Sequence, residues 1–164
     1  MKNLKSVFIF LVSAGLISSC DYESDIIKVI NESDITITVY IPSKTENGKI
    51  ELTDNFIGNQ PETLEPGDSL YYYTRMSPKQ MFAQKYKVPI PVYIFAPEDI
   101  EKYGWEKVIA DEMIIVQYSV SADDARHLNC RTTYPPNEEM KNVLMYPPYE
   151  EVIENYNRMI SEKE

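Results

Sequence analysis

The clearest chemistry in this sequence is a covalent modification at Cys20. This cysteine follows Ile17-Ser18-Ser19, and small residues at this point are typical of cleavage by a lipoprotein signal peptidase. Two lysines near the start and an apolar run over 7–17 complete the pattern of a bacterial lipoprotein signal peptide. The sequence therefore predicts a signal peptide over 1–19 and a lipidated Cys20, and an ordinary secretory signal peptide is the alternative. Two or three acyl chains would anchor the protein stably, because each buried methylene contributes about 0.8 kcal/mol.

The second cysteine of the chain, Cys130, has no partner for an intrachain disulfide once Cys20 is lipidated. A lone thiol in an exported protein is either reactive or a small buried hydrophobe. Cys130 lies between Leu128 and a β-prone stretch, without a neighbouring lysine cluster. We therefore expect it to be buried and unreactive.

Catalytic chemistry has little support in the sequence. His127 is the single histidine, and the chain has no metal-binding Cys and His pattern, no Gly-x-Ser-x-Gly motif and no glycine-rich phosphate loop. We accordingly predict that the protein is not an enzyme and that it has no catalytic residue, no metal site and no cofactor.

Adjacent carboxylates leave one enzymatic alternative open. A glycosidase needs two carboxyl groups at a set separation in a cleft, so a small carboxylate-dependent glycan hydrolase is the second hypothesis. In so acidic a chain, neighbouring carboxylates are usually solvated surface residues. The pairs are Asp111-Glu112, Asp123-Asp124, Glu138-Glu139 and Glu150-Glu151.

Aromatic residues are the better indication of a binding function. The chain has thirteen tyrosines, and strand alternation over 70–75 places Tyr71 and Tyr73 on one face and Tyr72 on the other. Tyr71 and Tyr73 are therefore the candidate ligand-binding residues, as flat platforms for sugar rings, with core packing as the alternative. For Trp105, in a nearby helical segment, we expect core packing.

The charge of the chain restricts its partners. The formal net charge is −10, and it becomes 14 − 26 = −12 once the two lysines of the signal peptide are removed. Nucleic acids and anionic membrane surfaces require a basic patch, so we predict no nucleic-acid partner. Contact with the membrane is expected through the N-terminal lipid, and the remaining partner is expected to be a glycan or an envelope protein.

Short strands and helices are predicted to alternate along one domain over 26–164, after a tether over 20–25. Alternating apolar residues predict a hairpin of strands 26–31 and 35–41, with one buried face. Further strands are expected over 49–53, 70–75, 92–95, 113–118 and 130–134, the last being the final strand. Helices are expected over 77–85, 97–111 with a break near Gly104, 122–128 with a Ser121 and Asp124 capping box, and 149–162.

This pattern predicts an α+β fold: an antiparallel sheet or incomplete β-sandwich covered by short helices, with a C-terminal amphipathic helix. Residues 149–162 place Val152, Tyr156 and Ile160 on one helical face. We expect this helix to dock on the sheet, and binding to another molecule is the alternative.

Several segments resemble a family of small lipoproteins from Gram-negative gut anaerobes, of the Bacteroidales type, without an assigned activity. The resemblance covers most of 26–136. It is carried by Leu64-Glu65-Pro66-Gly67-Asp68-Ser69, Glu101-Lys102-Tyr103-Gly104-Trp105, Gln117-Tyr118-Ser119-Val120, Leu128-Asn129-Cys130 and Thr133-Tyr134-Pro135. Where the family has an aromatic residue after Leu-Asn, this chain has Cys130, which fits a buried position.

The resemblance also has implications for location. Acidic residues just after the lipidated cysteine, here Asp21, Glu23 and Asp25, resemble an export signal to the cell surface in such bacteria. Asp68-Ser69-Leu70 resembles their O-glycosylation site, although a simple turn explains these residues equally well. The prediction is an outer-membrane lipoprotein, exposed at the cell surface, that acts as a non-enzymatic binding or scaffolding module.

Overall fold

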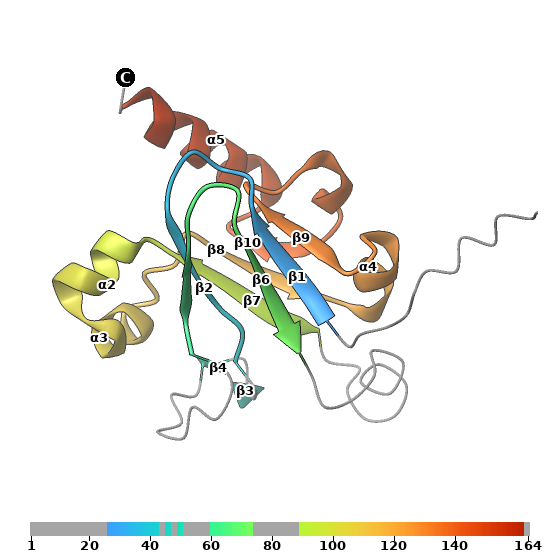
Figure 1. Ribbon diagram of the computed structural model, residues 1–164, viewed down its shortest axis with the longest axis horizontal. Coiled ribbons are helices and arrows are strands. Elements are labelled where there is room, and N and C mark those ends of the chain that lie inside the picture. Colours follow the sequence, from blue (N-terminus) through green and yellow to red (C-terminus); the bar gives the residue numbers. More distant parts are fainter. Residues whose placement is uncertain (1–25, 43–44, 47–48, 51–59, 74–88, 163–164) are drawn as a thin grey trace, which may run out of the picture.

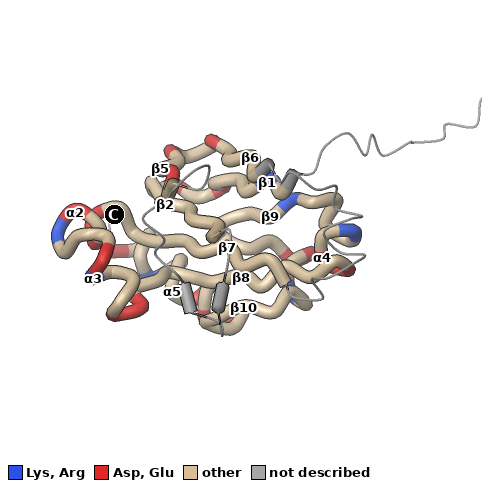
Figure 2. The backbone as a smooth tube through the Cα atoms, turned by 90° about the horizontal axis from the view of Figure 1, so that it is seen from below, with Lys and Arg blue, Asp and Glu red and all other residues tan. Residues whose placement is uncertain are grey.

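The computed structural model describes residues 26–42, 45–46, 49–50, 60–73 and 89–162 (Figure 1). Within these residues the chain forms two main β-sheets, a small two-stranded sheet and several short helices. The two main sheets lie in two layers (Figure 2). The predicted α+β class, with an incomplete β-sandwich and a C-terminal helix, is confirmed.

Sheet A has three strands in the order β6-β1-β9. Its central strand runs antiparallel to β6 and parallel to β9, so residues about 100 positions apart in the sequence pair side by side. The strands are β1 (Ile26–Asn31), β6 (Ser69–Tyr73) and β9 (Arg131–Tyr134).

Sheet B has five antiparallel strands in the order β10-β8-β7-β2-β5. They are β2 (Ile37–Tyr40), β5 (Glu62–Leu64), β7 (Ile90–Phe95), β8 (Val116–Val120) and β10 (Leu144–Tyr146). The small sheet pairs β3 (Thr45–Glu46) with β4 (Lys49–Ile50).

Four α-helices and one 3-10 helix, η1, lie in the described part of the chain after β7. They are α2 (Pro97–Tyr103), α3 (Trp105–Ala110), α4 (Ala122–His127), η1 (Glu138–Met140) and α5 (Tyr149–Ser161). The predicted break at Gly104 is confirmed, and its φ of 81° is a left-handed conformation that glycine adopts at low cost. The predicted capping box of α4 is also present.

The main core lies between sheets A and B. Val29 of sheet A and Val39, Val92 and Tyr118 of sheet B are fully buried in one apolar cluster. Helix α5 adds Val152 and the partly buried Tyr156 to the same cluster, so the helix docks on the sandwich as predicted.

A second apolar cluster covers the other face of sheet B. Tyr40, Tyr93 and Phe95 project away from the main core and pack with Val108 and Trp105 of α3. All four residues of β2 are consequently buried. The prediction that this strand buries only one face is wrong, because helices α2 and α3 cover its other face.

The predicted hairpin of 26–31 and 35–41 is also wrong. Strand β1 lies in sheet A and β2 in sheet B, so the chain crosses between the layers instead of turning back. The chain crosses between the layers a second time between β5 and β6, through the turn that contains Gly67 (φ 88°). Alternation fixes which residues face the core, but it is the same for a hairpin and for two strands in facing sheets.

Asn31 forms hydrogen bonds with both segments in which the chain crosses between the sheets. Its side chain is fully buried, and its amide nitrogen donates hydrogen bonds to the carbonyl oxygens of Ile35 (2.8 Å) and Leu64 (3.0 Å). Its amide oxygen accepts hydrogen bonds from the backbone N–H (3.1 Å) and the hydroxyl (2.5 Å) of Ser33. The hydrogen-bonding capacity of the buried amide is thereby satisfied within the corner.

The remaining predicted boundaries differ in detail. Strand β8 begins at Val116 instead of residue 113, and β9 is not the final strand, because β10 follows it. Strand β10 has the sequence LMY, and only its central residue is buried. Because all three residues are apolar, the sequence shows no alternation from which this strand could have been predicted. The predicted helix over 77–85 and the ends of the strands predicted over 49–53 and 70–75 lie outside the described residues.

Candidate functional site

The candidate site is the outer face of sheet A, which lies toward the viewer in Figure 1. Tyr71 projects from this face, because its neighbours Leu70 and Tyr72 pack on the main core, and 46% of its surface is exposed. The backbone register places Lys28 of β1 opposite Tyr71, and Arg131 of β9 on the other side of Lys28. We call these three residues, Tyr71, Lys28 and Arg131, the Tyr71 row.

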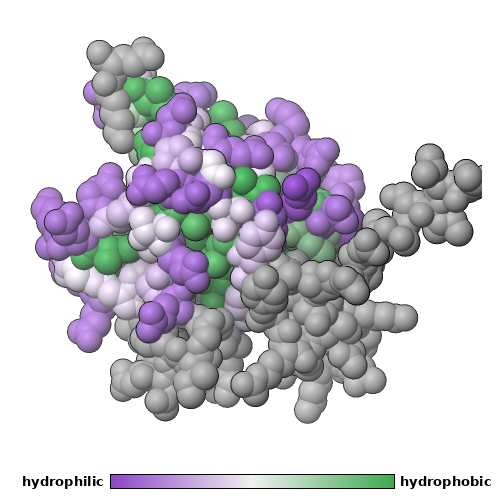
Figure 3. Space-filling model, viewed as in Figure 1, coloured by the Kyte–Doolittle hydropathy of each residue, from purple (hydrophilic) through white to green (hydrophobic). Residues whose placement is uncertain are grey.

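The Tyr71 row combines an aromatic ring with two cations. The Lys28 ammonium lies 5.0 Å from the centroid of the Tyr71 ring, within the range of a cation–π interaction. Hydrogen bonds from Lys28 and Ser69, followed by the charges of Lys28 and Arg131, lower the pKa of the Tyr71 hydroxyl. The row is therefore an electropositive surface with an exposed ring, and hydrophilic and apolar residues are interspersed on this side of the molecule (Figure 3).

The other two tyrosines of β6 differ from Tyr71. Tyr72 is half-buried and packs against the main core, as strand alternation predicts. Tyr73 pairs with Ile26 in the backbone register, and its side chain lies outside the described part of the structure. Tyr71 and Tyr73 were predicted as a pair. The exposure of Tyr71 is described by the structure, so the candidate site is built on Tyr71.

Trp105 lies in a different region from the tyrosine candidates. Its ring contacts Phe95 at 5.1 Å and Tyr40 at 5.3 Å between centroids, both edge to face, on the outer side of sheet B. The expected core packing of Trp105 is confirmed. The structure does not bring Trp105 to the Tyr71 row, because α3 covers sheet B and the Tyr71 row belongs to sheet A.

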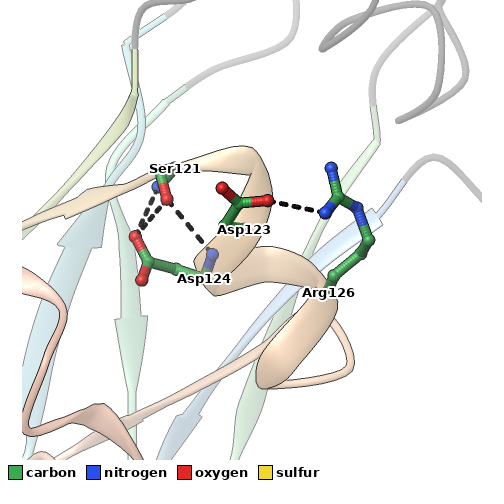
Figure 4. Close-up of polar contacts among 4 residues, drawn as sticks. All are labelled: Ser121, Asp123, Asp124 and Arg126. Atoms are coloured by element: carbon green, nitrogen blue, oxygen red, sulfur yellow. Dashed lines mark hydrogen bonds and ion pairs between the residues drawn. The ribbon is translucent and has the colours of Figure 1, made fainter.

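The carboxylates of helix α4 have local structural roles. Figure 4 shows Asp124 closing the capping box with Ser121, whose backbone N–H donates to the Asp124 carboxylate at 2.9 Å. Asp123 forms an exposed ion pair with Arg126 at 2.6 Å. His127 is the last residue of the helix and is exposed.

The residues of the other three predicted carboxylate pairs are exposed. Asp111 pairs with Lys107 one helical turn before it, and Glu150 lies 4.0 Å from Lys141. Glu138 accepts a hydrogen bond from the Tyr149 hydroxyl at 3.4 Å. Across the residues that the structure describes, no group of three or more His, Cys, Asp or Glu residues could hold a metal ion.

Cys130 is half-buried and packs against the main core. It immediately precedes β9 and has a φ of 59°, which places it in a tight turn together with Asn129. Burial raises the pKa of its thiol, which disfavours the reactive thiolate. These observations agree with the expectation of an unreactive cysteine.

The predicted lipidation site, Cys20, lies outside the described residues. A helix long and apolar enough to cross a membrane is not found among the residues described. Comparison with protein-family models, with curated proteins and with solved structures finds no match for the chain.

Sequence reasoning missed Lys28 and Arg131 as members of the site. The alternation of β1, in which Lys28 separates the buried Ile27 and Val29, could have placed Lys28 on an outer face. Arg131 could not have been found this way, because its position depends on the parallel pairing of β9 with β1.

Proposed function

We propose that this protein is a lipid-anchored protein of the outer membrane, exposed at the cell surface, whose α+β domain binds a glycan through the Tyr71 row. The lipoprotein signal over 1–19 and Cys20 support the anchor and the location. The observation that carries the binding function is the exposed Tyr71 ring beside Lys28, since aromatic faces with polar neighbours are favourable for sugar rings.

We assign no catalytic step to this module. Among the paired carboxylates that would serve a glycan hydrolase, Asp124 caps a helix, and Asp111, Asp123 and Glu150 form local ion pairs. These contacts do not favour glycan hydrolysis as an alternative to glycan binding.

The binding function is tested with the full chain, purified in detergent, on a glycan array. We expect Tyr71→Ala to lose the glycan signal of the unmodified protein. Tyr103→Ala is the matched control, because Tyr103 is 38% exposed and Lys102 lies 4.6 Å from its ring on helix α2. Equal binding by the Tyr71→Ala variant and the unmodified protein would contradict the proposal.

The anchor is tested separately. Cys20→Ala removes the sulfur that would carry the acyl chains, so we expect it to abolish fatty-acid labelling and to move the protein out of the membrane fraction. Retention of the label in this variant would contradict lipidation at Cys20.

A further inference from the structure

The charge of sheet A is opposite to that of the whole chain. The formal net charge of the protein is −10, yet its three strands, with sequences IIKVIN, SLYYY and RTTY, contain two basic residues and no acidic residue. Acidic residues gather instead along α2 and α3, at the opposite end of the molecule from α4, the helix that precedes β9 (Figure 2). The electropositive character of the Tyr71 row is thus a local property.

Among the residues that the structure describes, no carboxylate forms an ion pair with either cation of the Tyr71 row. Lys107, Arg126 and Lys141 all form ion pairs, whereas neither Lys28 nor Arg131 forms one with any residue that the structure describes. Glu32 follows β1 directly, and four residues of strand separate it from Lys28 by about 13 Å. At that distance, which exceeds the Debye length at physiological salt, solvent and salt screen most of the attraction.

The spacing of the row fits a short oligosaccharide. Neighbouring strands lie about 4.8 Å apart, so Tyr71 and Arg131 are separated by two strand spacings, or about 10 Å, with Lys28 between them. This distance is close to the length of two linked sugar rings. A guanidinium binds a carboxylate or sulfate with two parallel hydrogen bonds, and a lysine ammonium adds a point charge.

We propose that the Tyr71 row selects an acidic saccharide, with one sugar ring on Tyr71 and a carboxylate or sulfate of the next ring bound by Lys28 and Arg131. This inference rests on the proposed glycan-binding function and adds the chemical class of the ligand. Charge complementarity supports it, because a neutral sugar has no negative charge to meet the Lys28 ammonium and the Arg131 guanidinium.

The test measures affinity by calorimetry with the full chain in detergent. The probes are a galacturonic acid trimer, a chondroitin sulfate hexasaccharide and the neutral β-1,4-galactotriose, so that carboxylate, sulfate and neutral ligands are compared. We expect at least one acidic probe to bind about tenfold or more tightly than the neutral one. Raising the salt concentration should weaken only the acidic complex.

Substitutions distinguish selection of an acidic saccharide from glycan binding as such. Lys28→Met and Arg131→Met should each lower the affinity for the acidic probe about tenfold, since each removes a charge-assisted hydrogen bond. Both should lower the affinity for the neutral trimer much less than the affinity for the acidic probe. Lys102→Met and Arg126→Met are the matched controls, with the same loss of charge elsewhere on the surface, and should have no effect.

Two results would overturn the inference. If acidic and neutral probes bind equally and the Lys28 and Arg131 variants change nothing, the charge selection is wrong, although a loss of binding in Tyr71→Ala would still support glycan binding. If no acidic probe binds at millimolar concentration, the inference is also wrong. Arg131 is exposed, so folding of its variant is not at risk, and circular dichroism of each variant checks this.

Discussion

The substitution Asn31→Ala tests how the two sheets are held together. Asn31 is fully buried where the chain crosses from sheet A to sheet B, and its backbone also joins the second crossing. Its N–H donates to the Asp68 carbonyl oxygen at 2.9 Å, and its carbonyl oxygen accepts from the Gly67 N–H at 2.8 Å. Alanine retains these two bonds, so the substitution isolates the contribution of the side chain.

The expected magnitude follows from the groups that lose their partner. Without the Asn31 amide, the Leu64 carbonyl oxygen and the Ser33 N–H lose the bonds at 3.0 and 3.1 Å, in a region where both residues are buried. The Ser33 hydroxyl, which loses its acceptor on Asn31, lies 3.0 Å from the Ile35 carbonyl oxygen and can donate its one hydrogen there. Each unpaired buried group costs about 1–3 kcal/mol. We therefore expect the free energy of unfolding to fall by about 4 kcal/mol, a large part of the roughly 5–15 kcal/mol of a typical domain.

The measurement is urea unfolding followed by circular dichroism, with the midpoint and slope compared between variants. Ser33→Ala should cost less, about 1 kcal/mol, because the Asn31 oxygen keeps its bond to the backbone N–H. Asn142→Ala is the control, since Asn142 is exposed, and it should change stability by less than about 0.5 kcal/mol. A loss below 1 kcal/mol in Asn31→Ala would refute the role of this side chain.

Three further predictions concern buried groups. Cys130 should react slowly with a thiol reagent in the native protein and quickly in urea, and equal rates would contradict its burial. Tyr72→Ala should lower the unfolding free energy by about 2–3 kcal/mol while Tyr71→Ala changes it by less than about 0.5, as urea unfolding would measure. Burial raises the pKa of the Tyr118 and Tyr134 hydroxyls, so above pH 10 these tyrosines lose their protons in the unfolded state before they do so in the folded state. The free energy of unfolding should therefore fall by up to about 1.4 kcal/mol per pH unit for each tyrosine. An unfolding free energy that stays constant from pH 10 to 11 would contradict this.

Local sequence patterns predicted much of the helical structure. The break at Gly104 and the capping box of Ser121 and Asp124 depend on neighbouring residues only, and both are present. The periodicity of the last helix likewise depends on residues one turn apart, and α5 spans Tyr149–Ser161. Such interactions can be read from one sequence because the residues that make them are close along the chain.

Pairing between distant strands was harder to predict. The alternation of β1 and β2 correctly identified their core residues, but it could not say that they lie in different sheets. The parallel pairing of β1 with β9 joins residues about 100 positions apart in the sequence, and no local pattern encodes it. For the same reason the sequence indicated Tyr71 but not the two cations beside it.

The position of β1 determines how a pulling force would travel through the molecule. A ligand held on the Tyr71 row would act on the three strands of sheet A, and an anchor attached ahead of Ile26 would act on the central one, so tension between cell surface and ligand would not cross the interface between the two sheets. The hydrogen bonds that β1 makes to β6 and β9 run across the strand, and a pull along its axis loads them together in shear rather than one after another. An anchored domain with this topology would stay bound to its ligand under flow while only sheet A carries the force.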